Sequence, residues 1–159
     1  MAAKLISRRD LDFLLYDVMD VEKLTELPRF ADHGRETFAA TIDTAEAVAS
    51  EHFAACAAKL DAQEPVFDGE KVKMIPEVAA ALNEFYQAGF GAATQDYDDG
   101  GMQLPFTVSV ACKVLFGAAN TPILSYASLT QANANVIRNF GSDNQKKLFL
   151  QPLQQGRYM

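Results

Sequence analysis

A long stretch without charge sets the strongest limit on how this chain can fold. No charged residue occurs between Lys113 and Arg138, whereas a surface helix of ordinary composition would carry several charges over that length. Asn120, Pro122 and three later amide residues interrupt the stretch, so it is not continuously apolar as a membrane-spanning helix would be. We therefore expect a helix buried in the core of a soluble protein, and no membrane span.

This central helix is expected over roughly residues 122–140. Thr121 can cap its first turn, Pro122 suits that turn, and Gly141 can adopt the left-handed conformation after its last residue. Apolar residues three and four positions apart predict one buried stripe, formed by Leu129, Ala132, Val136 and Phe140. Small hydroxyl residues on the same helix indicate that part of its surface borders a cavity.

The same periodicity predicts a long helix from Gly34 to Leu60, whose apolar stripe is Phe38, Ile42, Ala45, Ala49, Phe53, Cys56 and Leu60. A short first helix would be capped by Ser7, with Leu11, Leu14, Leu15 and Val18 on its apolar side. Between 61 and 75 the chain has no periodicity and reads as a linker. Further helices would run from Pro76 to Gly89, from Pro105 to Asn120, and from the capping box Ser142–Gln145 to Pro152. The expected fold is an all-α bundle of about five to six helices.

Composition excludes several classes of function. The formal net charge is −7, which argues against a nucleic-acid partner, because such binding needs a basic face. Lysine and arginine are concentrated only near the start of the chain and at Lys146 and Lys147. Cys56 and Cys112 lie in apolar helical stretches and are expected to be buried free thiols. The N-terminus lacks the apolar core of a signal peptide, so we expect a cytoplasmic location.

The chain shows no complete catalytic or metal site. The loop from Asp96 to Gly101 resembles the start of an EF-hand calcium loop, but Thr107 stands where the bidentate glutamate is needed. A glycine turn before a helix is the better interpretation. His33 and His52 have no second ligand at a suitable spacing. We therefore expect no metal, and we assign no catalytic residue.

Several local sequences resemble the N-terminal helical domain of acyl-CoA dehydrogenases. The shared motifs are Gly89-Phe-Gly91, Asp99-Gly-Gly-Met-Gln-Leu-Pro105 and Ala118-Ala-Asn120. The most specific motif is Gly141-Ser-Asp-Asn-Gln-Lys-Lys-Leu-Phe-Leu-Gln-Pro-Leu-Gln-Gln-Gly156. The segment Arg9-Asp-Leu-Asp-Phe-Leu-Leu-Tyr-Asp17 is similar to the larger subgroup that includes 3-methylmercaptopropionyl-CoA dehydrogenase. The resemblance implies an N-terminal extension at 1–33, the helical domain at 34–156, and the truncated start of a missing β domain at 157–159.

The resemblance implies a function as well. The family oxidises acyl-CoA thioesters to the α,β-enoyl form, with a glutamate as base and FAD as hydride acceptor. The segments that carry the base and contact the flavin in the family have no counterpart here, so FAD belongs to the intact enzyme. The chain is then expected to be inactive alone and to act on acyl-CoA within a homo-oligomer. A stand-alone helical interaction or oligomerisation module without catalysis remains the alternative.

The helix that matches 122–140 lines one wall of the acyl pocket in the family. Alignment through the Gly141–Lys147 string places five residues on that wall: Leu124, Ser125, Ser128, Leu129 and Ala132. Helical spacing independently places them on one face. That face could equally pack on a neighbouring helix. The small residues Ala127, Ser128 and Ala132 also allow an apolar ligand, such as a fatty acyl chain, to bind between helices.

Overall fold

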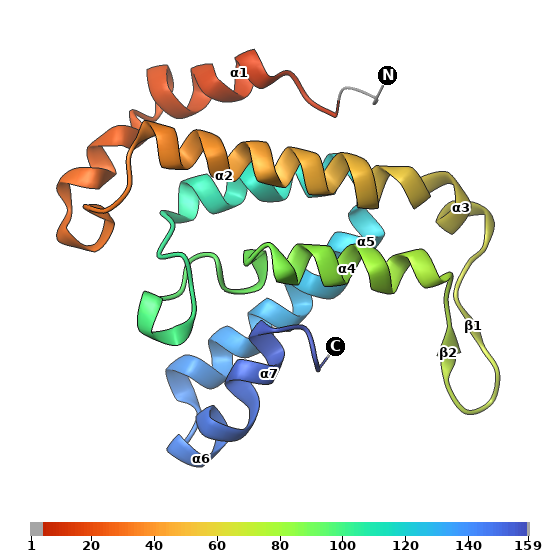
Figure 1. The fold of residues 1–159 in the computed structure, drawn as a ribbon. Helices are drawn as coiled ribbons and strands as arrows, with labels where there is room; N and C mark the ends of the chain where they lie inside the picture. Colours follow the sequence, from red (N-terminus) through yellow and green to blue (C-terminus); the bar gives the residue numbers. More distant parts are fainter. Residues whose placement is uncertain (1–4, 159) are drawn as a thin grey trace.

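The computed structural model describes residues 5–158 and shows a helical bundle with one small hairpin (Figure 1), which confirms the all-α prediction. Its helices and strands are α1 Arg8–Asp12, α2 Arg35–Val48, α3 Ala57–Ala62, β1 Val66–Phe67, β2 Val72–Lys73, α4 Pro76–Gln87, α5 Phe106–Phe140, α6 Asp143–Gln145 and α7 Gln151–Gln154. Short 3₁₀- or π-helical turns occupy Phe13–Val18, Val21–Glu26, Pro28–Phe30, Ala49–Phe53, Ala54–Cys56, Phe90–Ala92, Tyr97–Asp99 and Lys146–Leu150.

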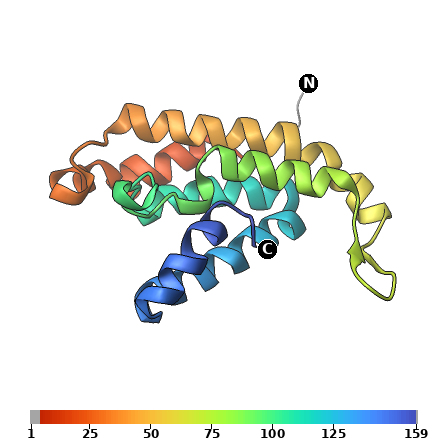
Figure 2. The ribbon, with the colours of Figure 1, turned by 60° about the horizontal axis from the view of Figure 1, so that its bottom comes forward.

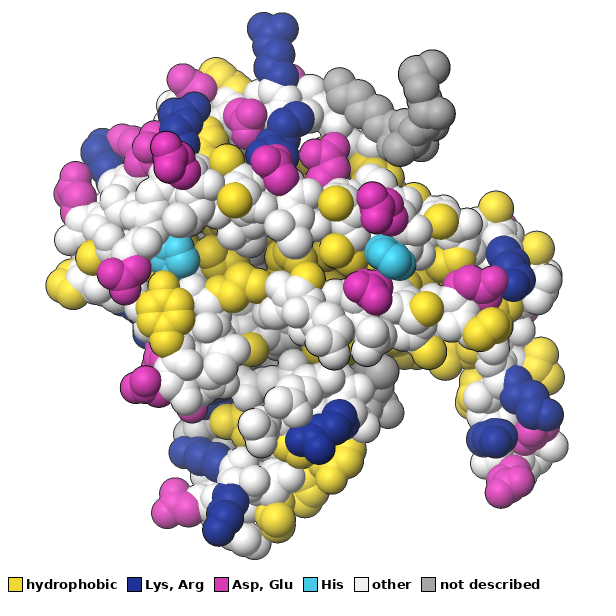
Figure 3. Space-filling view, viewed as in Figure 1, with side chains coloured by type: hydrophobic (Ala, Val, Ile, Leu, Met, Phe, Trp, Pro, Cys, Tyr) yellow, Lys and Arg dark blue, Asp and Glu magenta, His cyan; other side chains and the backbone are white. Residues whose placement is uncertain are grey.

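The bundle is organised around the long helix that begins with α2. From Arg35 the chain stays helical to Ala62, and all seven residues of the predicted stripe are buried. The ring of Phe53 lies 4.9 Å from that of Phe116 on α5 and 6.3 Å from that of Phe85 on α4. The core therefore lies where α2, α4 and α5 meet. Charged side chains gather over α1 and α2 on the outside of the bundle, as Figure 3 shows.

The helix α5 consists of two helices joined at Asn120. This residue has φ −165° and ψ 91°, and the two halves diverge there (Figures 1 and 2). The Asn120 side chain accepts a hydrogen bond from the backbone N–H of Ile123 at 3.3 Å and donates one to the carbonyl of Phe53, also at 3.3 Å. Asn120 is thus the cap of the second half. The prediction of Thr121 as the cap was wrong, since its hydroxyl donates back to Gly117.

The second half of α5 buries a different face from the one predicted. Its buried residues are Ile123, Ala127, Thr130 and Ala134. The predicted stripe faces outward instead: Leu129 is 72% exposed, Val136 57% and Phe140 85%, and Ala132 is exposed as well. This segment carries no charge before Arg138 in its last turn, so periodicity alone could not identify its inner face.

The N-terminal segment packs onto the same core. Ser7 caps α1 as predicted, and Leu15 and Val21 are buried. Arg8 forms ion pairs with three carboxylates, at 3.2 Å to Asp12, 2.7 Å to Asp43 and 3.4 Å to Glu46, and so anchors α1 on α2. Two predicted core residues, Leu14 and Val18, are exposed. The reason is that the chain becomes π-helical from Phe13, and a wider turn changes which residues share a face.

The predicted linker at 61–75 contains a two-stranded antiparallel hairpin that projects from the bundle (Figure 1). Asp68 fixes its turn, because its side chain accepts hydrogen bonds from the backbone N–H groups of Glu70 and Lys71. Both strands are exposed along their whole length. The hairpin therefore adds little to the core.

The C-terminal segment returns along the second half of α5. The predicted capping box is confirmed, since Ser142 and Gln145 exchange hydrogen bonds between side chain and backbone. Pro152 does not end the helix as expected, because it lies in the first turn of α7, where a missing N–H needs no partner. Gly141 is extended, at φ −70°, and not left-handed. A Cβ there would lie 2.5 Å from the Ile137 carbonyl oxygen, so this glycine permits a close backbone approach.

Within residues 5–158, α5 alone is long and apolar enough to cross a membrane by length and composition. Half of its most apolar window is buried inside the molecule, and the core helix of a soluble protein passes the same test. The polar break at Asn120 divides the helix into two halves, each packed against the bundle on one side.

Candidate functional site

The outward face of the second half of α5 is the first candidate surface, here called the α5 outer face. It comprises Leu124, Ser125, Ser128, Leu129, Ala132, Val136 and Phe140. With about 100° between successive residues, these positions lie opposite the buried face that contains Ile123 and Ala127. The α5 outer face is apolar, uncharged and largely open to solvent.

All five predicted pocket residues lie on this face, with different exposure. Ser125, Leu129 and Ala132 are exposed, Ser128 is half-buried, and Leu124 is half-buried against the core. The hydroxyl of Ser125 donates to the Thr121 carbonyl at 2.9 Å, so it is already used by its own helix. The structure thus places the five residues on one face of the helix, and no segment among residues 5–158 forms a pocket with that face.

The loop after α4 holds the second half of α5 in place. Gln95 donates to the side-chain oxygen of Asn135 at 3.1 Å, Gln131 donates to the Phe90 carbonyl at 2.6 Å, and Arg138 pairs with Asp99. The compact shape of the loop depends on Gly101, where a Cβ would lie 2.2 Å from the Gln95 carbonyl oxygen. A group of carboxylates, histidines or cysteines that could hold a metal is absent from residues 5–158.

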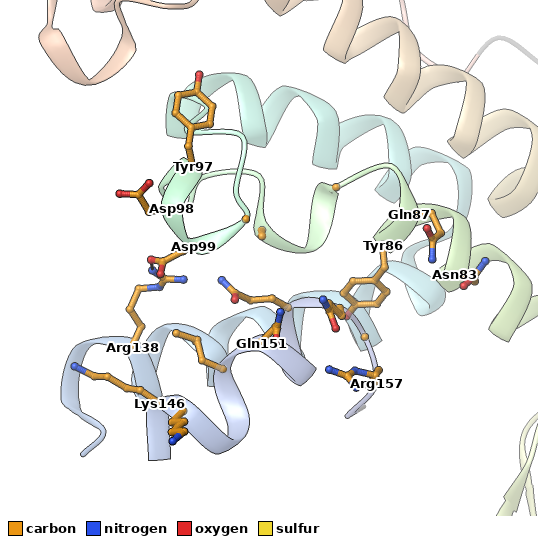
Figure 4. Close-up of a pocket in the computed structure, with 18 residues that line it drawn as sticks. Asn83, Tyr86, Gln87, Tyr97, Asp98, Asp99, Arg138, Lys146, Gln151 and Arg157 are labelled. Carbon is orange, nitrogen blue, oxygen red and sulfur yellow. Dashed lines mark hydrogen bonds and ion pairs between the residues drawn. The ribbon is translucent and has the colours of Figure 1, made fainter. Parts of the chain in front are cut away.

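The second candidate surface is a cleft between this loop, the end of α4 and the C-terminal helices (Figure 4). Its volume is about 1340 Å³, and it is here called the C-terminal cleft. Tyr86 forms part of its floor, and two glycines of the family motifs, Gly91 and Gly156, pack on the Tyr86 ring. A Cβ at Gly91 would lie 2.4 Å from it, and one at Gly156, where φ is +68°, would lie 2.3 Å from it. These glycines therefore close the C-terminal segment onto α4.

Burial raises the pKa of the Tyr86 phenol above its ordinary value. Burial also raises the pKa of the Cys112 thiol, to about 12, and lowers the pKa of Lys113. None of these groups lies on the α5 outer face. This face has no carboxylate and no imidazole, so it cannot remove a proton from a bound substrate.

The α5 outer face does not suit a flavin by itself. An isoalloxazine ring needs hydrogen-bonding groups along its polar edge, and this face has only two hydroxyls, of which that of Ser125 is already bound to its own helix and that of Ser128 belongs to a half-buried residue. What this face offers is apolar contact. It can bind the hydrocarbon part of a ligand, and it has no group that takes part in a reaction.

The C-terminal cleft was not predicted from the sequence. Two signals pointed to it, namely the concentration of lysine at Lys146 and Lys147 and the glycine that ends the family string at Gly156. Periodicity could not combine them, since the cleft joins segments that lie nearly forty or more residues apart in the sequence. The loop Tyr97–Gly100 forms its opposite wall.

Comparison with known proteins gives one positive result. Residues 35–157 match the family model described as acyl-CoA dehydrogenase, N-terminal domain. None of the curated proteins matches the chain. The match covers α2 to the end of the C-terminal helices and includes both candidate surfaces.

Proposed function

The chain belongs to the acyl-CoA dehydrogenase family through its N-terminal domain, and we propose that its α5 outer face forms one wall of the pocket for the acyl chain of an acyl-CoA thioester. One observation carries this proposal. Leu129 and Phe140 are large apolar residues that are 72% and 85% exposed on a face of α5 that carries no charged residue. A hydrocarbon chain would cover such a surface and would meet no charged group there.

The energetics favour an acyl chain on this face. Each methylene removed from water contributes about 0.8 kcal/mol, and the small side chains of Ser125, Ser128 and Ala132 let a chain approach the helix closely. The polarity of the face is low because the Ser125 hydroxyl is bound within the helix. The face supplies binding and orientation.

The reaction needs groups that this face does not contain. In the intact family enzyme, FAD supplies the hydride acceptor. Residues 124–140 include no general base. We expect the 159-residue chain to show no dehydrogenase turnover when it is mixed with acyl-CoA and an electron acceptor. Sustained turnover that follows the purified 17.4 kDa chain would contradict this.

Acyl binding is best tested with a fluorescent polyene acyl-CoA titrated into the chain. Leu129→Asp places a charge in the middle of the α5 outer face, and we expect it to weaken binding at least about tenfold. Leu27→Asp is the matched control, since Leu27 is 50% exposed in the N-terminal segment, outside this face. Equal affinities for the parent chain and both variants would refute the proposed acyl wall.

An interaction module is the second candidate function. The exposed apolar side chains on α5 and on the hairpin, where Phe67 is 66% exposed, favour this alternative. Exposed apolar side chains of this kind mark sites of association when they form a patch. We then expect the chain to form homo-oligomers that light scattering detects and that Leu129→Asp dissociates. A monomer at high micromolar concentration would exclude self-association.

Two finer assignments come from the sequence alone. The N-terminal segment 9–17 supports membership of the subgroup that includes 3-methylmercaptopropionyl-CoA dehydrogenase. In the intact enzyme, this predicts a preference for a short thioether acyl chain over a straight chain of equal length, measured as relative kcat/KM. A cytoplasmic location is also proposed, and cell fractionation of the tagged full-length protein tests it.

A further inference from the structure

The N-terminal segment, residues 5–33, precedes the part of the chain that matches the family model, which is residues 35–157. It nevertheless binds a loop of the matched part, residues 94–104, which leads into α5. The turns Val21–Glu26 and Pro28–Phe30 lie at the same end of the bundle as the turn Tyr97–Asp99 (Figures 1 and 2). A segment outside the family match therefore shapes a loop inside it.

Arg29 attaches the N-terminal segment to this loop in both directions. Its guanidinium pairs with Asp96 and donates to the Thr94 carbonyl at 3.1 Å. In return, the side chain of Gln103 donates to the Arg29 carbonyl at 2.5 Å. Gln103 has a φ of +52°, a left-handed conformation that is uncommon for residues other than glycine. Such a conformation persists only where surrounding contacts determine it, so the N-terminal segment helps to hold the loop in this shape.

His33 is the second attachment. Its Nε2 atom lies 3.0 Å from the Met102 carbonyl oxygen and 3.2 Å from the Gln103 carbonyl oxygen. Since both neighbours are acceptors, Nε2 carries the hydrogen and donates to them. The imidazole also stacks on Phe38, with ring centroids 5.7 Å apart, and Phe38 is fully buried in α2. His33 thus connects the loop to the core of the bundle.

The same loop holds the second half of α5. Gln95 donates to the side chain of Asn135 at 3.1 Å, and Asp99 pairs with Arg138, toward which it points in Figure 4. The backbone N–H of Gln103 donates to the Gln95 carbonyl at 2.8 Å. The residue that the N-terminal segment binds is therefore bonded directly to a residue that binds α5.

We propose that the N-terminal segment is a positioning element for the second half of α5, and so for the acyl wall, with Arg29 and His33 acting through the loop. The part that concerns acyl binding rests on the proposed function of the α5 outer face. Neither Arg29 nor His33 belongs to that face, so their effect on a ligand there is indirect. A wall that is already fixed in place costs less free energy to order when the ligand binds.

Hydrogen exchange of the 159-residue chain, measured by mass spectrometry, tests the positioning. A single exposed ion pair contributes little, so the double variant Arg29→Gln with His33→Phe removes both attachments and keeps a ring to stack on Phe38. We expect amide exchange in residues 123–138 to become about fivefold faster or more, because the loop then holds this half of α5 less firmly.

Lys23→Gln is the matched control. It makes the same change in net charge as Arg29→Gln and removes an ion pair with Asp20 within the N-terminal segment, away from the loop. Its exchange in residues 123–138 should stay within about twofold of the parent, as expected for an exposed pair. Acceleration confined to the loop, or equal acceleration in the control, would overturn the proposal.

A double-mutant cycle separates positioning from a general loss of stability. Arg29→Gln removes the contact with one side of the loop, and Asp99→Asn weakens the contact of the other side with Arg138. If the loop transmits the effect, Arg29→Gln should accelerate exchange in α5 less in the Asp99→Asn background than in the parent. Fold-changes that simply multiply would show independent contributions and overturn the proposal.

Titration with the fluorescent polyene acyl-CoA connects the positioning to the acyl wall. We expect the double variant Arg29→Gln with His33→Phe to bind about threefold more weakly or worse, and Lys23→Gln to bind like the parent. Unchanged affinity in the double variant would overturn its role in acyl binding. Failure of the parent chain to bind acyl-CoA would refute the acyl wall itself, whereas faster exchange in α5 would still support positioning through the loop.

Discussion

The long helix that begins with α2 and the second half of α5 carry similar apolar stripes and use them in opposite ways. In the α2 helix, the stripe from Phe38 to Leu60 is buried. In α5, the stripe from Leu129 to Phe140 is exposed, and a face of smaller residues such as Ala127 and Ala134 is buried. An apolar stripe at helical spacing therefore identifies residues that favour burial. It does not show whether they pack in the core of the bundle or stay exposed for a ligand or a partner.

Charge explains why the two helices differ. The charged residues Glu36, Asp43 and Glu51 of the α2 helix are exposed, and they exclude every orientation except the one with the stripe inside. The second half of α5 has no charge until Arg138, so both of its faces are compatible with burial. The bundle takes the small face, because small side chains allow close packing of helices. The large residues remain outside for a ligand or a partner.

The largest test of this comparison truncates one phenylalanine on each helix. Phe53→Ala should lower the free energy of unfolding by about 3–5 kcal/mol, because Phe53 is fully buried against Phe85 and Phe116. Phe140→Ala should change it by less than about 0.5 kcal/mol. Urea unfolding measures both values. A comparable loss in the two variants would mean that the α5 stripe is also part of the core.

Enlarging a small residue sharpens the comparison within α5 itself. Ala127→Leu should cost about 1–3 kcal/mol, since Ala127 is fully buried in the contact between α5 and the bundle. Ala132→Leu, on the exposed face, should be nearly neutral for stability. Thermal unfolding of the two variants distinguishes the faces. The reverse order of effects would place the inner face of α5 on the predicted stripe.

The junction at Asn120 ties the second half of α5 to the core, so its loss should have an intermediate effect. Asn120→Ala removes the cap on Ile123 and the hydrogen bond to the Phe53 carbonyl, and we expect a cost of about 1–2 kcal/mol. Asn133→Ala, at an exposed position of the same helix, is the control and should change stability by less than about 0.5 kcal/mol. Equal effects would mean that the cap does not stabilise the junction.

The smallest expected effect is the pH dependence of stability that comes from Cys112, which is buried in the first half of α5. Burial raises the pKa of Cys112 to about 12 from its ordinary value of 9.0. A raised folded-state pKa gives stability that is complete below pH 9 and is lost as the pH rises toward 12. By pH 10 the loss is about 1 kcal/mol. The measurement compares this loss in the parent chain with that in Cys112→Ala. An unchanged pH dependence in the variant would contradict the assignment.

The sequence by itself determined the helical fold and most of its core. The charged residues beside the α2 stripe fixed its inner face, and the capping box at Ser142 and Gln145 marked the start of the last helical segment. These features depend on residues within a few positions of one another. Backbone hydrogen bonding and side-chain spacing act over that same short range.

Only the tertiary structure decided which face of α5 is free and where the C-terminal cleft lies. The junction of the two halves of α5 is tied to the core by Asn120, which donates to the carbonyl of Phe53, 67 positions away along the chain. The cleft needs Gly156 to pack on Tyr86 and the loop at Tyr97 to lie opposite the C-terminal helices. Contacts between distant segments leave no periodic trace in the sequence. An uncharged helix has no local feature that selects one of its faces, so the packing of the whole bundle makes that choice.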